Sequence, residues 1–388
     1  MIKKETITVC GIPVGGVEPI TCAIQDGSIL WIEKDSKIKE VDFGDEETII
    51  SPLLLDAQVN GGFGITIQDE NLNEEKLLTL SQKLYQLGIV RWIPTIVTTS
   101  IEKTIFLCRT IANSLRNKEL SFAIPGIHLE GPWISPEDGP RGAHPIEHIR
   151  KPSRKEWEKY YQSAEGKILY VTLAPEQKNA IPFIRYLVSQ GVKVSLGHHN
   201  ADVSTMQKAV EAGATLCTHL GNGIHNYIHR HNNPIWFSLA EKRLSVSVIA
   251  DGHHLPPPIL KVISACKPSN NIFLVSDATQ FMGMKPGVYE EFGSPVELKG
   301  DGKLCLKGTP YLAGSASSLL DCIPIWQEHT HYSWDKCFKC ASSVPAKLLG
   351  VKMPTFRLYP GAKANFMCLK LDQKNEELSP LSIFCKNK

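Results

Sequence analysis

Short apolar segments alternate with longer amphipathic ones between residues 51 and 352. The short segments are rich in Val, Ile, Leu and Thr and end in polar or small residues, which is typical of buried parallel strands. They are LLLDAQVN, RWIPTIVT, AIPGIHLEG, ILYVTLAP, VKVSLGH, TLCTHLGN, LSVSVIADG and NIFLVSDA. The pattern therefore predicts eight strands along this part of the chain.

The longer segments have apolar residues three and four positions apart, which predicts amphipathic helices. Examples are 74–88, 180–191, 201–213 and 256–267, and the first three end in Gly, a common helix stop. Eight strands with intervening helices predict a (β/α)8 barrel, a fold of roughly 250 residues. An open doubly wound sheet is the alternative, but no Gly-rich GxGxxG turn follows the first strand.

Both chain ends instead contain short alternating segments separated by turns, as antiparallel strands do. The N-terminal ones are TITVCG, ITCAIQDG, SILWIEK and KIKEVDFG; the C-terminal ones are TFRLYPG, ANFMCLKLD and LSPLSIFC. We expect residues 1–50 and 353–388 to form one small β-sandwich, and residues 51–352 to form the barrel. Two unrelated edge extensions are the alternative.

Composition limits the classes of partner. The 388 residues are 42% hydrophobic and 21% charged, with a formal net charge of +2, so nothing electrostatic favours nucleic acid or an anionic membrane. No apolar stretch is long enough to span a bilayer, and we expect no export signal. The 11 Cys are irregularly spaced, which favours reduced thiols and a cytoplasmic location. Cys337 and Cys340 form one isolated CxxC, which we interpret as helix packing.

Potential metal ligands stand at the ends of three predicted strands: Glu130 in GIHLEGPW, His198 in VKVSLGHHN and His219 in ATLCTHLGN. Because the carboxyl ends of barrel strands meet at one face, these side chains are expected to converge. Two His and one Glu leave a divalent metal with open positions, as catalysis requires. Strand alternation alone does not choose between His198 and His199.

Other strand ends carry further candidates. Gln58 and Asn60 share one face of the first strand, either toward the site or in a turn. Asp277, at the end of the eighth strand, is suited to act as a general base beside a metal or, alternatively, as a helix N-cap. His144, in RGAHP, and His254, in IADGHH, are loop residues close in sequence to such strand ends.

The segment after His219 offers two features that suit an anion. Backbone N–H groups of the Asn222–Gly223 turn can form an anion-binding nest. Arg230 lies in the His-rich loop IHNYIHRHNN, and a guanidinium suits phosphate or carboxylate. The alternative is that this loop is simply a polar surface.

Taken together, these segments resemble the amidohydrolase superfamily and, within it, the N-acetylglucosamine-6-phosphate deacetylases. The resemblance covers nearly the whole chain and rests on GIHLEGPW, GHHNAD followed by AVEAGAT, THLGNG, IADGHH, LVSDAT, YLAGSA, SVPAKLLGV and YPGAKANFMCL. It implies a (β/α)8 barrel with a β-sandwich from both ends, and hydrolysis of the acetamido group of N-acetylglucosamine 6-phosphate. Alternatives are another N-acyl amino sugar or a cyclic amide as substrate, or a metal-dependent sugar-phosphate sensor without activity.

The resemblance also implies one divalent metal, zinc with iron or manganese as alternatives, bound by Glu130, His198 and His219. It selects His198 over His199, and it makes Asp277 the general base and acid. Gln58 and Asn60 occupy positions where other amidohydrolases carry a His-x-His pair. Because neutral amides are poor ligands for zinc, a mononuclear site is expected.

Substrate contacts are implied for His144, which would also assist catalysis, for His254, and for the backbone at Asn222–Gly223 and at Leu312 and Ala313. Gln58 and Asn60 are expected to contact the substrate as well. Arg230 matches a position from which a neighbouring subunit reaches the phosphate, which implies a homodimer. The chain departs from the family at HLGNGIH, where relatives have HLxNAM. This change at Gly221, Gly223 and Ile224 alters the pocket wall beside the second His ligand.

Overall fold

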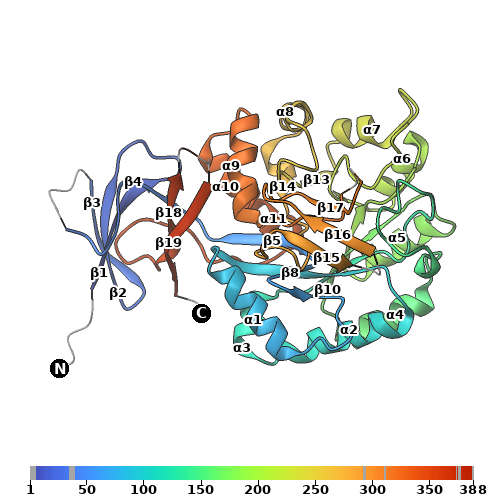
Figure 1. Ribbon diagram of the computed structural model, residues 1–388, viewed down its shortest axis with the longest axis horizontal. Coiled ribbons are helices and arrows are strands. Elements are labelled where there is room, and N and C mark those ends of the chain that lie inside the picture. The colour runs from blue at the N-terminus through green and yellow to red at the C-terminus, as the bar shows by residue number, and fades with distance from the viewer. Residues whose placement is uncertain are drawn as a thin grey trace.

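The chain folds into a parallel barrel and a smaller mixed sheet built from both of its ends (Figure 1). The computed structural model describes residues 6–34, 40–291, 294–309, 312–372, 374 and 377–386. The predicted fold class, a (β/α)8 barrel with a terminal β-sandwich, is confirmed.

The barrel strands follow one another in chain order around a single parallel sheet. They are β5 Leu54–Val59, β8 Ile89–Val97, β9 Ile127–Glu130, β10 Ile168–Leu173, β11 Lys193–Leu196, β12 Leu216–Cys217, β13 Ser245–Val248 and β14 Ile272–Leu274. A parallel bridge between Val59 and Ala278 joins the last strand to the first. The sheet therefore closes, which excludes the open doubly wound alternative, and all eight predicted strands are present.

Helices separate the strands and surround the barrel (Figure 1). They are α1 Glu74–Tyr85, α2 Ile101–Ser114, α3 Lys118–Ala123, α4 Arg154–Ser163, α5 Ala180–Ser189, α6 Val203–Glu211, α7 Pro234–Ala240, α8 Pro257–Cys266 and α9 Leu319–His329. Polar caps begin many of them; Asn73, Ser100 and Asp202, for example, each accept a hydrogen bond from a backbone N–H in the first turn. All four helices predicted from periodicity are confirmed.

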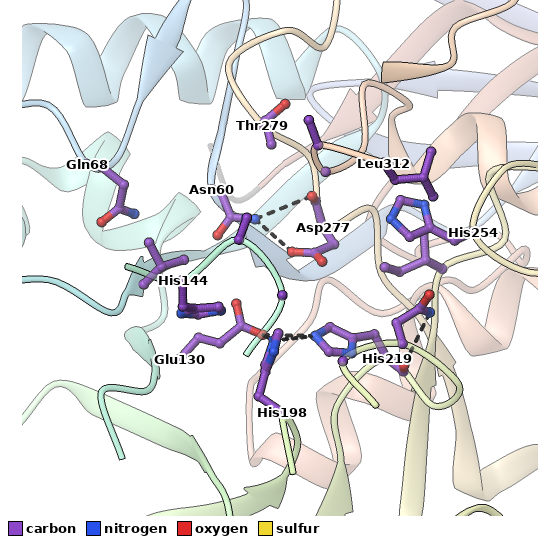
Figure 2. Close-up of a pocket in the computed structure, with 18 of the residues that line it drawn as sticks. Asn60, Gln68, Glu130, His144, His198, His219, His254, Asp277, Thr279 and Leu312 are labelled. Atoms are coloured by element: carbon purple, nitrogen blue, oxygen red, sulfur yellow. Dashed lines mark hydrogen bonds and ion pairs between the residues drawn. The ribbon is translucent and has the colours of Figure 1, made fainter. Parts of the chain in front are cut away.

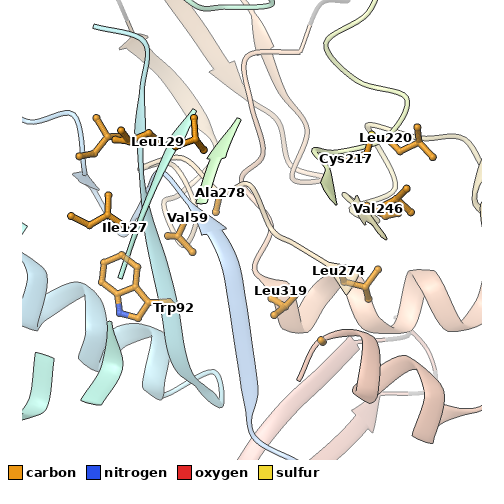
Figure 3. Close-up of a cluster of buried hydrophobic side chains, with 14 of the residues drawn as sticks. Val59, Trp92, Ile127, Leu129, Cys217, Leu220, Val246, Leu274, Ala278 and Leu319 are labelled. Carbon is orange, nitrogen blue, oxygen red and sulfur yellow. The ribbon is translucent and has the colours of Figure 1, made fainter. Parts of the chain in front are cut away.

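Apolar side chains fill the space between the strands and the helices (Figure 3). The cluster includes Trp92, Leu129, Val246, Leu274 and Leu319, which are all 0–1% exposed. A close-packed wall of this kind holds the strand ends in fixed positions, so side chains carried there need little further ordering.

The small sheet has the order β19–β18–β4–β1–β2–β3. Its strands are β1 Ile7–Pro13, β2 Ile20–Gln25, β3 Ser28–Lys34, β4 Phe43–Ser51, β18 Asn365–Asp372 and β19 Glu377–Cys385. The edge strand β3 hydrogen-bonds through Ile29 to Gly361 and Ala362, just before β18, so the sheet curls back on itself around its own core. The predicted domain bounds, residues 51–352 for the barrel and residues 1–50 with 353–388 for the small domain, stay a prediction.

Two details of the chain ends differ from expectation. The predicted strand TFRLYPG is wrong, because residues 355–361 contain no strand and end in a turn at Gly361, φ +86°. In KIKEVDFG the strand begins only at Phe43, and residues 37–39 lie outside the described part of the chain.

A three-stranded antiparallel sheet between β14 and α9 was not predicted. It comprises β15 Gly287–Glu291, β16 Ser294–Leu298 and β17 Leu304–Leu306. Its inner face packs Val296, Leu298 and Leu304 against Phe281. The available signal was the spacing of Val296 and Leu298, two positions apart in SPVEL. A short hairpin, β6 Gly61–Gly62 with β7 Ile65–Thr66, follows β5.

The CxxC prediction is confirmed: Cys337 and Cys340 are buried free thiols in α10 Trp334–Cys340, which precedes α11 Ser343–Leu349. Among the described residues, no helix has both the length and the apolar character that crossing a membrane requires.

Candidate metal centre and active-site pocket

The loops at the carboxyl ends of the barrel strands enclose a cavity of about 260 Å³. Figure 2 shows Glu130, His144, His198, His219 and Asp277 directed toward one another within it. Of the residues singled out from the sequence, those lining the cavity are Asn60, Glu130, His144, His198, His219, Asn222, Gly223, His254, Asp277, Leu312 and Ala313. The strand ends therefore do converge.

Three predicted ligands meet in a tight cluster (Figure 2). Glu130 Oε1 lies 3.2 Å from His198 Nε2 and 3.1 Å from His219 Nε2, and the two Nε2 atoms are 3.0 Å apart. All three residues are at most 7% exposed. Donor atoms bound to one zinc ion at about 2.0–2.2 Å have similar mutual spacings. One carboxylate oxygen and two imidazole nitrogens at these distances fit a divalent ion.

The ring of His198 is oriented for such a role. Its Nδ1 lies 2.9 Å from the carbonyl oxygen of Pro140, which can only accept a hydrogen bond. The ring proton therefore sits on Nδ1, and Nε2 presents a lone pair to Glu130 and His219. A looser group, Glu130, His144 and His198, has donor atoms within 4.8 Å of one another. We favour the tighter cluster because its spacings match one coordination sphere.

The backbone is strained where the site is assembled. His198, His219 and Asp277 have φ values of +53°, +30° and +50°, a left-handed region that non-Gly residues seldom adopt. Each follows the end of a barrel strand. Strain of this kind persists only where the surroundings impose it, and it clusters at functional sites. It supports a functional role for all three side chains.

Asp277 faces the cluster from the end of β14 and is held by two amides, of which Figure 2 shows that of Asn60. Gln58 Nε2 and Asn60 Nδ2 donate to Asp277 Oδ1 at 3.0 and 2.7 Å, and Gln58 Nε2 also donates to Glu130 Oε1 at 3.0 Å. Both contacts use Oδ1, so Oδ2 is the oxygen left to act in the cavity. Burial, reinforced by the negative charge of Glu130, raises the pKa of Asp277.

Two further imidazoles line the cavity with their Nδ1 atoms engaged by the protein. His144 Nδ1 lies 2.8 Å from Thr98 Oγ1, and His254 Nδ1 lies 2.7 Å from Asp251 Oδ2. Burial, with the neighbouring His198, lowers the pKa of His144 to about 3. In both residues Nε2 is the ring nitrogen that remains available to contact a bound ligand.

Three candidates from the sequence lie outside the cavity wall. Gln58 is 1% exposed and lies behind Glu130 and Asp277. Its amide hydrogen-bonds to these two carboxylates and does not line the cavity. His199 is buried, with Nδ1 accepting a hydrogen bond from the backbone N–H of Ala201. Arg230 is exposed on its loop, away from the cavity of its own chain.

The sequence reasoning missed other residues of the wall. Thr66, Gln68 and Thr279 line the cavity, and Thr98 lies just behind His144. None belongs to a recognisable metal or acid–base pattern. The only signal was their position at or some residues after the end of a predicted strand, and many hydroxyl and amide residues share that position.

The Gly223 turn beside His198 gives a testable constraint. A Cβ at Gly223, φ +61°, would lie 2.9 Å from His198 Nδ1, whereas one at Gly221, φ +94°, would meet the flexible end of Leu255 at 2.9 Å. We expect Gly223→Val, whose branched side chain is larger than the Ala of relatives, to displace the His198 ring and weaken metal binding by about 10–100-fold, as disturbed second-shell contacts do. Competition with a fluorescent chelator measures this. Gly221→Val is the matched control, and equal losses in both variants would contradict the argument.

Comparisons with known proteins agree with this architecture. The model of the Amidohydrolase family matches residues 49–387. N-acetylglucosamine-6-phosphate deacetylase of Bacillus subtilis is 31% identical over 335 residues, covering 84% of this chain and 83% of the relative. N-acetylgalactosamine-6-phosphate deacetylase of Escherichia coli is 30% identical, covering 83% of each.

A solved structure supports the same assignment. The N-acetyl-D-glucosamine-6-phosphate deacetylase of Mycobacterium smegmatis superimposes with a TM-score of 0.82 at 25% identity, covering 98% of this chain and 99% of that one. The match includes the terminal sheet as well as the barrel. This chain belongs to the amidohydrolase family, in the group of the N-acetylglucosamine-6-phosphate deacetylases.

Proposed function

We propose that this protein hydrolyses the acetamido group of N-acetylglucosamine 6-phosphate, giving glucosamine 6-phosphate and acetate. The observation that carries the proposal is the convergence of Glu130, His198 and His219 at 3.0–3.2 Å, with Asp277 facing them. The similarity to deacetylases over more than four fifths of the chain supports the substrate class.

Glu130, His198 and His219 would hold one divalent ion, zinc or alternatively iron or manganese. When bound, such an ion polarises the amide carbonyl and makes water a better nucleophile. The neutral amides of Gln58 and Asn60 bind Asp277 and so are occupied by the protein, which supports a single ion.

Asp277 would carry the proton transfers. Its carboxylate would take a proton from the attacking water as the new C–O bond forms, and deliver it to the sugar nitrogen as the C–N bond breaks. A raised pKa of Asp277 suits both proton transfers, because the carboxylate must accept a proton from water and then release it to the sugar nitrogen. His144 Nε2 would donate a hydrogen bond to the carbonyl oxygen as negative charge develops there.

The other cavity residues would orient the sugar phosphate. The backbone N–H group of Gly223, together with His254, would bind the phosphate, whereas the predicted contact from the Asn222 N–H is wrong because that group donates to the His219 carbonyl oxygen at 2.9 Å. The backbone at Leu312 and Ala313 would contact the sugar. Arg230, exposed on its own chain, would reach the phosphate of a partner subunit in a homodimer. Binding energy from the phosphate would thereby fix the amide for attack.

One relative supports a second candidate substrate. The 30% identity to an N-acetylgalactosamine-6-phosphate deacetylase makes the C4 epimer a specific alternative. The altered HLGNGIH turn lies on the cavity wall next to His219, where such a difference could be accommodated.

Acetate release from three compounds tests the proposal: N-acetylglucosamine 6-phosphate, N-acetylgalactosamine 6-phosphate and unphosphorylated N-acetylglucosamine. We expect removal of the phosphate to cost about 2–5 kcal/mol in kcat/KM, roughly 30- to 5,000-fold, as for other desolvated charge contacts. Arg230→Ala should lower kcat/KM only for the phosphorylated sugars. Equal kcat/KM with and without phosphate would contradict the substrate assignment, and preference for the galactosamine epimer would select the second candidate.

A further inference from the structure

We propose that Thr98 is a positioning residue that fixes the tautomer of His144, so that His144 presents Nε2–H to the cavity and does not act as a metal ligand. The inference rests on the proposed function, because it concerns the group that would donate to the amide oxygen. It follows from a difference between two neighbouring imidazoles. His144 and His198 pack edge to face with ring centroids 4.4 Å apart, and each has Nδ1 bound by a different kind of group.

The partner of His144 is a hydroxyl with a single proton to give. Thr98 Oγ1 lies 2.8 Å from His144 Nδ1, and its other acceptor in reach, the carbonyl oxygen of Glu130, is at the 3.5 Å limit. The proton therefore goes to the closer and better placed acceptor, Nδ1. A neutral imidazole that accepts at Nδ1 must carry its own proton on Nε2.

The hydroxyl has little freedom to turn elsewhere. Thr98 is 2% exposed at the end of β8, and its branched side chain has few rotamers. Gly131, φ +81°, passes so close that a Cβ there would overlap Thr98 Oγ1. The backbone after Glu130 thus holds the hydroxyl against the His144 ring.

His198 shows the opposite arrangement. Its Nδ1 faces the carbonyl oxygen of Pro140 at 2.9 Å, so its proton stays on Nδ1 and its Nε2 is bare. A bare Nε2 binds a metal, whereas Nε2–H can only donate a hydrogen bond. Glu130, His144 and His198 have donor atoms within 4.8 Å of one another, so a bare Nε2 on His144 would create a competing ligand set. Thr98 removes that possibility and supplies the donor.

The direct test is ¹⁵N spectroscopy of the His144 ring in holoenzyme and in metal-free enzyme, for wild type, Thr98→Val and Thr98→Ser. We expect Nε2–H in wild type and Thr98→Ser, and loss of that preference in Thr98→Val, which has the same shape but no hydroxyl. In parallel, kcat should fall about 10–100-fold in Thr98→Val with little change in KM, as for other outer-shell partners, and Ser should restore most of it. Wild-type enzyme with Nδ1 protonated would overturn the proposal.

A double-mutant cycle separates this role from a merely structural one. If Thr98 acts through His144, then Thr98→Val should have no further effect on kcat in a His144→Ala background. A second loss of tenfold or more in that background would overturn the proposal. The spectroscopic result needs no substrate, so it decides the role of Thr98 even if wild-type enzyme releases no acetate and the proposed function fails.

Discussion

Replacing Asp277 by Asn is expected to lower kcat for acetate release by about 10²–10⁴-fold, the usual contribution of a positioned acid–base group. The substitution is close to isosteric. Its amide oxygen can still accept the hydrogen bonds that Gln58 and Asn60 now donate to Asp277 Oδ1 at 3.0 and 2.7 Å. What is lost is the ability of the second oxygen to take a proton from water and return it to the sugar nitrogen.

Steady-state kinetics at saturating substrate, with metal content measured on the same samples, provide the readout. KM should change much less than kcat, because proton transfer takes place in the transition state. Asp321→Asn is a suitable control, since that carboxylate belongs to the capping box of α9, away from the cavity wall. A turnover near that of wild type, with the metal retained, would remove Asp277 from the acid–base role.

The barrel was predictable because its signals are local. Each parallel strand is an apolar run that the helices bury, and each helix repeats its apolar positions every three or four residues. The same logic failed for TFRLYPG, which alternates like a strand. Its side chains Phe356 and Leu358 pack on the core of the small sheet, but among the described residues its backbone meets β3 only around Ile29, through Gly361 and the following Ala362, so no strand pairs with it along its length. Pairing partners, which decide whether such a segment becomes a strand, lie far away in sequence.

The site was predictable as a set of strand ends but not in its orientation. Alternation could not choose between His198 and His199, because β11 ends at Leu196 and His198 then adopts φ +53°. The rule that neighbouring side chains face opposite ways holds only inside a strand. The tertiary structure imposes the left-handed backbone, so only resemblance to a family could select His198.

Residues that hold the metal ligands and the acid–base groups in position were the least predictable part of the site. Gln58 was expected to contact substrate, and its amide in fact lies between Glu130 and Asp277. Thr98 carried no signal beyond its position at the end of a predicted strand, because a hydroxyl gains a role only from the group it meets, here His144 Nδ1. Second-shell contacts depend on loops that converge in three dimensions, and no spacing in the sequence encodes them.

Glu130→Gln is expected to reduce metal affinity by at least about 100-fold, since even outer-shell partners of a metal contribute 10–100-fold. Glu130 Oε1 is the atom shared by His198 Nε2, His219 Nε2 and the amide of Gln58. Burial acts to raise the pKa of Glu130, but the two His rings beside it hold that pKa well below its usual range, so Glu130 supplies a full negative charge. Gln keeps the shape and removes that charge.

The effect of this substitution should appear in stability as well as in activity. A ligand that binds only the folded state stabilises it by RT ln(1 + [L]/Kd), about 4 kcal/mol at 1,000 times Kd. Chelation should therefore lower the melting temperature of wild-type enzyme, and should change that of Glu130→Gln little. Glu137→Gln, the same substitution at an exposed carboxylate bound by His225 and Asn200, should keep both the metal and the chelator response. If Glu130→Gln kept one equivalent of metal and the wild-type response, the ion would have to be held by another set of residues.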